Sequence, residues 1–387
     1  MDKKMELKLI ELRRDIHRHP ELGNKEFRTT SVIEKFLSQA GIVTRRPSKT
    51  GVVALISGTK EGAGSSRVMA LRADIDALPI AEKTNKPYSS RTAGVMHACG
   101  HDANTAMVAG AALLLARRRN EFAGTVKCIF QPNEEAAGGA LGMIRAGVLK
   151  NPVPDCIVGI HVNPWLKTGT LGVKAGAMMA AVDRFTIKIA GARSHGAYPH
   201  LGKDSIVIAA QVIQSLQSVV ARQIDPVDPA VVTVGTIQGG EAFNVLAGSV
   251  TITGTVRALN NKMRRDIERI MRRHVAMIVK AYGAGYSFEY ESLGRPLENS
   301  AKVLSLCRRA GSAALGKKNI VEIEKPSMGG EDFSEYLRYV PGCFIFMGAR
   351  LSVPHPWHSE LFDVDERALA KGAAVLEEIA VSYLLGK

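Results

Sequence analysis

The chain has 387 residues, of which 46% are hydrophobic and 23% are charged. At about 100 to 200 residues per domain, this length predicts two or three domains and excludes a peptide or a small disulfide-stapled scaffold. The composition is typical of a soluble globular protein and excludes collagen, coiled coil and extended disorder. Lys and Arg total 51 against 37 Asp and Glu, a formal net charge of +14, which raises nucleic acid as a partner.

The positive charge lies on expected helix faces and not in a nucleic-acid motif. Across residues 262–280, Met263, Ile267 and Ile270 form an apolar stripe, and the arginines lie off it. The chain has no zinc-finger spacing and no RNA-binding aromatic motif, and aromatic residues are only 5% of it. We therefore expect no nucleic-acid partner.

Three features bear on location. The longest apolar run, residues 103–116, is shorter than the roughly 20 residues of a bilayer span, so we expect no membrane partner. The first 17 residues are charged throughout and lack the apolar core of a secretory signal. The five cysteines are odd in number and scattered, which favours reduced thiols. Together these features predict a cytoplasmic protein.

Helices and strands alternate along most of the chain. Apolar stripes predict helices over residues 5–17, 29–40, 105–118 and 139–146. Near-continuous apolar runs predict buried strands over residues 51–56, 67–74, 125–130, 156–161 and 343–347. This alternation predicts an α/β fold with a mainly parallel sheet covered by helices.

The middle of the chain has a different order of elements. Strands are expected at 183–190, 230–238, 249–259 and 286–291, with helices at 205–223 and 263–282. That order is βαββαβ, the ferredoxin-like split motif. Because the earlier pattern resumes after Pro296, we expect a domain at 182–291 inserted into a larger one formed by 1–181 and 292–387.

A short segment, His97-Ala-Cys99-Gly-His101-Asp102, contains a thiol, two imidazoles and a carboxylate. Cys99 and His101 are two residues apart, so an extended backbone would point both side chains to one side, and Gly100 permits a tight turn. Sulfur and nitrogen donors at this spacing suit a metal ion.

Further titratable residues follow predicted strands. Glu134 and Glu135 come just after the strand at 125–130, His161 ends the next, and His358 follows the last one. The carboxyl ends of parallel strands converge on one crevice, where ligands bind in open α/β sheets. Five ligands there are too many for one tetrahedral metal but suit a two-metal site: Cys99, His101, Glu135, His161 and His358. Two adjacent carboxylates at a strand end can point to different places, one to a metal and one to a metal-bound water.

Other polar residues could assist this site. Asp74 and Asp76 end a strand and are expected to orient ligand imidazoles, although capping of the next turn explains them nearly as well. In the inserted domain, His195 lies between small residues and could donate a hydrogen bond to an oxyanion. Asn244 and Arg257 could hold a substrate carboxylate, or Arg257 could be an ordinary exposed strand residue.

With these residues in place, the chain resembles the M20 metallopeptidase family, in particular its amidohydrolase branch. The resemblance covers almost the full length through ordered blocks: RRDIHRHPEL, LRADIDALP, VMHACGHD, FQPNEE, GIH, SHGAYPH, GGEAFN, GTVRALN, GGEDF and His358-Ser. It implies a zinc-peptidase-like α/β domain and an inserted lid domain through which such proteins form dimers or tetramers. It also implies hydrolysis of N-acyl amino acids or short peptides.

The resemblance assigns roles to the same residues. It implies that Cys99, His101, Glu135, His161 and His358 bind two divalent ions of Zn, Mn, Ni or Co in each subunit, and that Glu134 is the general base. It makes His195 an oxyanion donor, in its own active site or a partner's, and gives the substrate carboxylate to Asn244 and Arg257. Asn104 departs from the branch, which commonly has His there, and Ala247-Gly248 stands in place of Pro-Asp.

Three alternatives remain open from the sequence. The same cleft chemistry would serve a carboxypeptidase or dipeptidase. A catalytically idle relative could bind a ligand or an acidic partner, although intact Glu134 and five intact ligands argue against this. Finally, Cys99 could be a nucleophile paired with His97 or His101.

Overall fold

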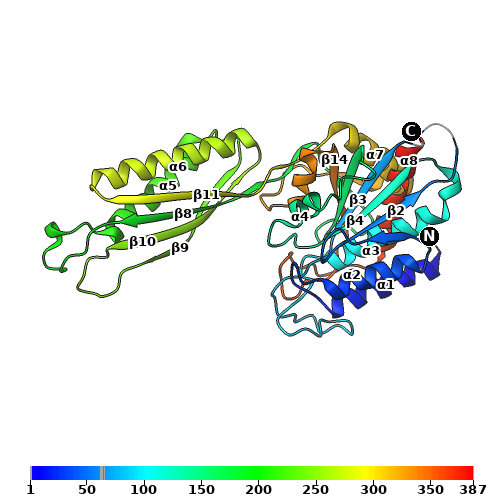
Figure 1. Cartoon of the computed structure of the whole chain (residues 1–387), viewed down its shortest axis with the longest axis horizontal. Coiled ribbons are helices and arrows are strands. Elements are labelled where there is room, and N and C mark those ends of the chain that lie inside the picture. The colour runs from blue at the N-terminus through cyan, green and yellow to red at the C-terminus, as the bar shows by residue number, and fades with distance from the viewer. Residues whose placement is uncertain (1, 62–63, 65, 387) are drawn as a thin grey trace. The chain divides into compact units, whose positions relative to one another are not determined.

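The computed structural model describes residues 2–61, 64 and 66–386, which form two compact units (Figure 1). Unit 1 comprises Met1–Gly176, Glu298–Lys325 and Asp332–Lys387, and unit 2 comprises Ala177–Leu297 and Pro326–Glu331. The short strands β7 (Gly176–Met179) and β12 (Leu297–Asn299) lie where the chain leaves unit 1 and where it returns. Unit 2 thus begins and ends several residues outside the expected 182–291, and it also includes the later segment Pro326–Glu331.

Unit 1 contains an eight-stranded sheet in the order β1-β2-β4-β3-β5-β14-β6-β13. Strands β3, β4, β5 and β14 at its centre are parallel to their neighbours within that group. Antiparallel pairs occur at β1–β2, β2–β4 and β6–β14. The strands are β1 (Val43–Arg45), β2 (Val52–Ser57), β3 (Val68–Asp74), β4 (Thr125–Gln131), β5 (Cys156–Asn163), β6 (Leu171–Val173), β13 (Ile320–Glu322) and β14 (Gly342–Gly348). The expected mainly parallel sheet is confirmed.

The central strands are buried on both faces. Every residue of β3, β5 and β14 is buried, and β4 is buried after its first residue. This explains why the sequence shows continuous apolar runs there and no alternation. Two polar residues of β3, Arg72 and Asp74, are fully buried within this apolar run, so both need internal partners.

Six α-helices of unit 1 flank the sheet or pack on one another: α1 (Lys3–Arg18), α2 (Phe27–Ser38), α3 (His101–Arg117), α4 (Gly139–Arg145), α7 (Ala301–Leu315) and α8 (Arg367–Leu384). Helix α3 is buried along most of its length between α1 and α8. Small residues allow this close packing: a Cβ at Gly110 would lie 2.7 Å from Leu9 and 2.8 Å from Ala373. Short 3-10 helices occur at Arg119–Glu121, Pro199–Leu201, Lys317–Asn319 and Asp332–Arg338.

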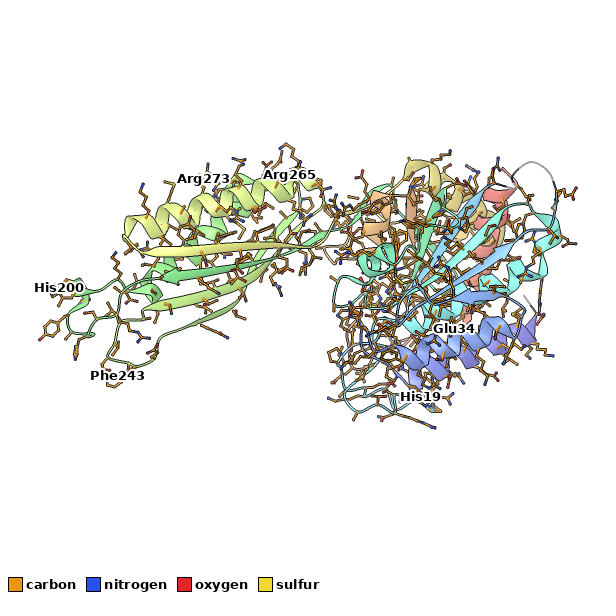
Figure 2. The ribbon with its side chains drawn as sticks, viewed as in Figure 1. His19, Glu34, His200, Phe243, Arg265 and Arg273 are labelled. Atoms are coloured by element: carbon orange, nitrogen blue, oxygen red, sulfur yellow. The ribbon has the colours of Figure 1, made fainter. Side chains whose placement is uncertain are left out.

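Unit 2 has the expected βαββαβ order. It consists of β8 (Ala181–Ala190), α5 (Ser205–Gln223), β9 (Ala230–Gly239), β10 (Ser249–Ala258), α6 (Asn261–Ala281) and β11 (Gly285–Gly294). Its four-stranded sheet has the order β11-β8-β10-β9, with antiparallel pairing throughout. Both helices pack on the sheet and on each other, and Figure 1 shows them on the same face. Arg265 and Arg273 extend outward from α6, away from the sheet (Figure 2).

Helix α5 bears on the expectation of no membrane partner. Among the described residues, it is the helix long and apolar enough to cross a membrane by length and composition alone. It is not an uninterrupted apolar run, because Gln211, Gln214 and Gln217 lie within it. Its buried face includes Ile208, Val212, Leu216 and Val219, which belong to the core of unit 2 together with residues of α6 and the sheet.

Candidate metal centre

The carboxyl ends of the central strands in unit 1 bring the candidate ligands together. Asp74, the last residue of β3, is in register with Gln131, the last residue of β4, so Glu134 and Glu135 follow immediately beyond this edge. His161 lies two residues before the end of β5, toward the same edge. The backbone N–H of His358 donates to the carbonyl of Ala98 at 2.8 Å, which places it beside the Cys99 segment.

A turn at Gly100 directs Cys99 and His101 to this edge. Gly100 has a φ of 92° and precedes His101, the first residue of α3. A Cβ at this position would lie 2.4 Å from Val162 Cγ2, so only glycine fits both the backbone conformation and the space. The expected extended backbone is therefore wrong for His101: the two side chains converge because the chain turns into a helix.

The donor atoms form overlapping groups that could each hold a cation. One group is Cys99, His101 and His161, a second is Cys99, Glu135 and His358, and in each the donor atoms lie within 4.8 Å of one another. The Cys99 Sγ is 3.6 Å from His161 Nε2, and the two oxygens of Glu135 lie 3.7 Å from His101 Nε2 and 3.4 Å from His358 Nε2. The five predicted ligands thus lie in one cluster: Cys99 belongs to both groups, and Glu135 lies between His101 and His358.

The chemistry of this cluster fits cation binding. His101 Nε2 and Glu135 Oε1 are buried and have no hydrogen-bond partner among the described residues. Burial raises the pKa of the Cys99 thiol, and the Glu135 carboxylate raises it further. Burial lowers the pKa of His161 to about 4, which keeps that imidazole neutral. A cation would supply the missing partners and stabilise a thiolate, so these residues suit divalent metal ions.

Asp74 and Asp76 contact the predicted ligand His101. Asp76 Oδ1 lies 3.3 Å from His101 Nδ1, and Asp76 Oδ2 accepts the backbone N–H of Glu135 at 3.0 Å. Asp74 Oδ2 lies 3.8 Å from His101 Nε2. Burial alone would lower the pKa of His101, but the Asp74 charge, the Cys99 side chain and the Asp76 contact together raise that pKa. Asp76 therefore orients one imidazole and one backbone segment at once.

Asn104, which departs from the amidohydrolase pattern, has two defined partners. Its Nδ2 donates to Asp74 Oδ1 at 2.8 Å, and its Oδ1 accepts the backbone N–H of Val162 at 2.9 Å. The amide thereby joins α3 to the end of β3 and to the residue after His161. Asn104 is buried and performs this bridging without an ionisable ring.

Glu134 lies beside the metal-binding groups. It forms a possible cation-binding group with His101 and Glu135, and its Oε1 accepts the backbone N–H of Asp332 at 3.4 Å. The preceding residue, Asn133, has a φ of 55° and donates its N–H to Glu26 at 2.8 Å. Asn133, with its strained backbone and its hydrogen bond to Glu26, thus sets the direction of the Glu134-Glu135 segment.

His195, Asn244 and Arg257 all belong to unit 2. His195 pairs with Val245 across a β-bridge, and the N–H of Gly196 donates to the Asn244 carbonyl at 2.7 Å, so His195 and Asn244 share one loop cluster. Arg257 lies near the far end of β10, eight residues beyond its start at Ser249, or about 26 Å at 3.3 Å per residue. Within one chain, Arg257 therefore lies far from His195 and Asn244.

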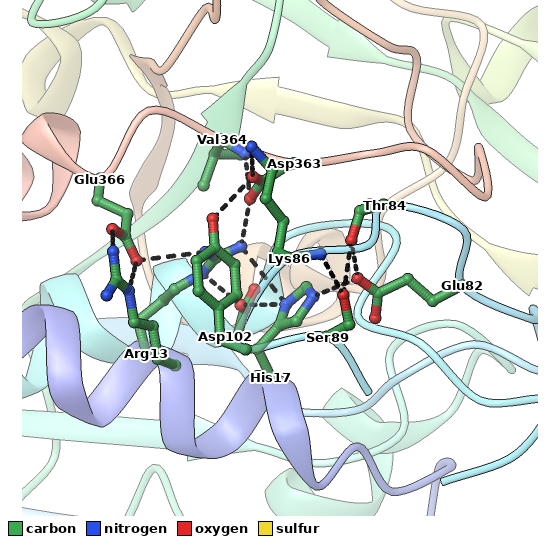
Figure 3. Close-up of polar contacts among 12 residues, drawn as sticks. Arg13, His17, Glu82, Thr84, Lys86, Ser89, Asp102, Asp363, Val364 and Glu366 are labelled. Atoms are coloured by element: carbon green, nitrogen blue, oxygen red, sulfur yellow. Dashed lines mark hydrogen bonds and ion pairs between the residues drawn. The ribbon is translucent and has the colours of Figure 1, made fainter. Parts of the chain in front are cut away.

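A buried ionic network, not expected from the sequence, joins α1 to the start of α3 (Figure 3). Arg13 donates to Asp102 Oδ2 at 2.7 Å and to Asp363 Oδ1 at 2.8 Å, and His17 Nδ1 lies 2.8 Å from Asp102. Arg13 is fully buried, and the pKa of Asp102 is lowered because Arg13 and His17 outweigh the effect of burial. The position of the charged Arg13 on the apolar face of α1 is the sequence feature that could have indicated this network.

The network fixes the backbone on both sides of the candidate ligands. Asp102 directly follows His101, and Asp363 lies five residues after His358. Helix α1 thus anchors the start of α3 and the segment after His358. Cys, His and Glu donors thus lie at the carboxyl edge of a mainly parallel sheet, with a further glutamate beside them. This is the arrangement of a metal-dependent hydrolase.

Comparison with known proteins gives the same class. Residues 70–382 match the peptidase family M20/M25/M40, which is more than half of the chain. The chain therefore belongs to this family, and it is a hydrolase of amide bonds. The resemblance drawn from the sequence blocks is confirmed.

Individual relatives align over nearly the whole chain. The chain is 41% identical to N-acetyl-L-cysteine deacetylase of Bacillus subtilis (strain 168) over 381 residues, covering 98% of this chain and 89% of the relative. It is 40% identical to IAA-amino acid hydrolase ILR1-like 5 of Arabidopsis thaliana, covering 97% and 87%. The crystal structure of the YXEP protein of Bacillus subtilis, a dinuclear metal-binding peptidase of the M20 family, superposes with a TM-score of 0.87 at 40% identity and covers 99% of both chains.

Proposed function

We propose that this chain hydrolyses the amide bond of N-acyl amino acids at a site for two divalent metal ions. The observation that carries the proposal is the cluster of predicted ligands at the carboxyl edge of the sheet: Cys99, His101, Glu135, His161 and His358. Its buried unpartnered donor atoms need a cation, and Glu134 lies beside them. The similarity to an N-acetyl-L-cysteine deacetylase and to a plant IAA-amino acid hydrolase supports an N-acyl amino acid as substrate.

In this mechanism Glu134 carries the protons. When bound, the two ions supply positive charge that polarises the substrate carbonyl and lowers the pKa of the attacking water. Glu134 accepts a proton from the water as its oxygen adds to the carbonyl carbon, and it delivers that proton to the amide nitrogen as the C–N bond breaks. Asp76 holds His101 and the backbone of Glu135 in place during both steps.

Unit 2 supplies the substrate contacts in this proposal. His195 donates to the developing oxyanion, and Asn244 and Arg257 bind the substrate carboxylate. Since Arg257 lies about 26 Å along β10 from the loop cluster, a single chain does not bring all three to one substrate. Two copies of the chain can do so, which supports a homodimer, or a tetramer built from such dimers.

The surface around His195 also supports an interface. Phe243 is fully exposed at the end of the β9–β10 connection (Figure 2), and Tyr198, Leu201 and Val245 are exposed nearby in the same loop cluster. Apolar groups gathered in this way are typical of a surface that binds another protein. We propose that a second copy of the chain covers them.

Metal identity and location are part of the proposal. One sulfur, three nitrogen donors and a carboxylate suit Zn, Mn, Ni or Co. All five cysteines are free thiols, which supports a location in the reducing cytoplasm.

The test is amine release from a panel of N-acetyl, N-benzoyl and indole-acetyl amino acids and dipeptides, with each metal and with a chelator. Metal-dependent release from N-acyl amino acids is the expected result. Preferential release from dipeptides would favour a carboxypeptidase or dipeptidase. Silence across the panel in protein holding two metals would favour a binding role, and release that survives the chelator would favour Cys99 as nucleophile.

A further inference from the structure

A buried cluster next to Glu134 has no part in the mechanism above. Arg72 of β3 donates from Nη2 to Asp332 Oδ1 at 3.0 Å, from Nε to Gln131 Oε1 at 2.9 Å and from Nη1 to Asp74 Oδ2 at 2.8 Å. Gln131 of β4 also donates from Nε2 to Asp332 Oδ1 at 2.7 Å. Two neighbouring strands thus hold one oxygen of the Asp332 carboxylate.

The second oxygen of Asp332 is held from another direction. Its Oδ2 accepts the backbone N–H of Ala140 at 2.9 Å, and the N–H of Gly138 lies at 3.5 Å. The side chain is therefore fixed by donors from β3, β4 and the start of α4, while the residue itself begins the 3-10 helix Asp332–Arg338.

This arrangement is costly as a purely structural device. Arg72 and Asp332 are both buried, and the single Arg72 cation is shared between Asp332 and Asp74. Burial raises the pKa of Asp332 to about 6 although the Arg72 charge opposes the rise. Buried ion pairs contribute little net stability compared with apolar packing, so a role in setting one exact position explains this cluster better.

The restrained residue touches the proposed base through its backbone. The N–H of Asp332 donates to Glu134 Oε1 at 3.4 Å. Because the side chain of Asp332 is anchored to the sheet, the direction of this N–H is fixed relative to the strands that carry the metal ligands. A fixed donor to one carboxylate oxygen favours the side-chain conformations of Glu134 that keep Oε1 near this N–H.

We propose that Asp332 is a positioning residue for Glu134: its carboxylate, anchored by Arg72, Gln131 and Ala140, fixes the backbone N–H that holds the Glu134 carboxylate. The inference rests on the proposed function, since it requires Glu134 to act as base. Asp332 touches neither the substrate nor the metal ligands in this role. Without the Asp332 carboxylate, the position of the Glu134 carboxylate is less restricted. A misplacement of a catalytic group by about 1 Å can lower the rate about 10²-fold.

The test is a double-mutant cycle on the metal-loaded enzyme with Asp332→Asn and Glu134→Asp. Asn has nearly the shape of Asp, but its NH₂ group replaces an acceptor and opposes one of the donors. In wild type we expect Asp332→Asn to lower kcat about 10- to 100-fold, with KM and bound metal unchanged. In the Glu134→Asp background the shorter carboxylate does not reach the Asp332 N–H, so we expect a further loss of less than about 2-fold.

Asp365→Asn is the matched control. Asp365 is also buried and is bound by Arg367 and by Thr168 at 2.9 Å, but it has no connection to Glu134. We expect it to lower the unfolding midpoint without changing kcat. If Asp332→Asn does not fold, Gln131→Leu removes one donor to Asp332 and should give a smaller kcat loss, again only when Glu134 is present.

Several results would overturn the inference: an equal kcat loss in both backgrounds, a loss of bound metal, a rise in KM in place of a fall in kcat, or an unchanged kcat. Failure of the proposed function looks different. In that case Glu134→Asp itself keeps full kcat, whereas an impaired Glu134→Asp together with a silent Asp332→Asn overturns the inference alone.

Discussion

The two units hold their functional residues in different ways. In unit 1 the candidate ligands His101 and His161 are buried, Cys99 and Glu135 are partly buried and His358 is exposed. Asp76 contacts His101, and Arg13 and Arg72 bind the neighbouring carboxylates Asp102 and Asp74. In unit 2 His195 and Asn244 are exposed on loops, and Arg257 is half-buried with one nitrogen, Nη1, lacking a hydrogen-bond partner among the described residues. The candidate metal ligands are thus brought together by one chain, whereas the substrate contacts proposed for unit 2 are the part assigned to a dimer. The following predictions test this contrast.

The largest effect is expected at Glu134. Glu134→Gln keeps the size of the side chain but cannot accept a proton, so we expect kcat to fall about 10²- to 10⁴-fold while two metals remain bound. Turnover and metal content measured on the same preparation check this. Undiminished turnover would end the assignment of Glu134 as base.

The buried network of unit 1 should dominate stability. Arg13→Met leaves Asp102 and Asp363 buried without their cation, and we expect a loss of about 3 to 5 kcal/mol in the free energy of unfolding. The control is Arg184→Met in unit 2, whose ion pair with Glu291 is exposed and should contribute nothing measurable. Urea unfolding compares the two variants, and equal losses would contradict the contrast between the units.

An exposed loop residue should affect rate without affecting stability. His195→Ala removes one oxyanion donor, so we expect kcat to fall about 10²- to 10³-fold with an unchanged unfolding midpoint. If His195 acts in the partner's site, mixing this variant with Glu134→Gln should restore activity in the mixed dimer. Unmixed preparations serve as the control, and no recovery after subunit exchange would place His195 in its own chain's site.

A smaller and more selective effect is expected at Arg257. Its proposed role is to bind the substrate carboxylate, so Arg257→Ala should raise KM about 10-fold for N-acyl amino acids with a free carboxylate. The same substrates with an amidated carboxyl group are the comparison. Equal changes on both substrate forms would mean that Arg257 does not contact the carboxylate.

The smallest effect is a pH-dependent change in stability at Glu26. Burial raises the pKa of Glu26 to about 7, and the charge of Asp76 adds to the rise. The folded state therefore keeps this proton to a higher pH than the unfolded state, so stability falls as pH rises from about 4.5 to about 7.

Glu26→Gln keeps an acceptor for the Asn133 N–H and removes the titration. We expect its unfolding midpoint to equal that of wild type near pH 4.5 and to exceed it by a few degrees at pH 8. Thermal unfolding across this pH range measures the difference. A constant difference at all pH values would show that Glu26 has an ordinary pKa.

Sequence patterns placed the elements of unit 2 and the central strands of unit 1 to within a few residues, because their periodicities are local and strong. No range was expected for α7, α8 or the short strands β1, β6 and β13. The strand expected at 125–130 is β4 (Thr125–Gln131), and the helix expected at 205–223 is α5 (Ser205–Gln223). Patterns were less informative where polar residues are buried. Arg72 and Asp332 resemble surface residues in the sequence, and only the folded sheet shows that they bind each other.

The sequence by itself determined the α/β class, the ferredoxin-like insertion, the family and the set of residues able to bind metal. These follow from hydrophobic periodicity and from donor types at particular spacings, both of which can be read along the chain. Only the tertiary structure decided that Gly100 turns Cys99 and His101 together and that Asn104 bridges two strands. It alone separated Arg257 from Asn244 along β10. These facts depend on distances between residues far apart in the chain, which no local pattern encodes.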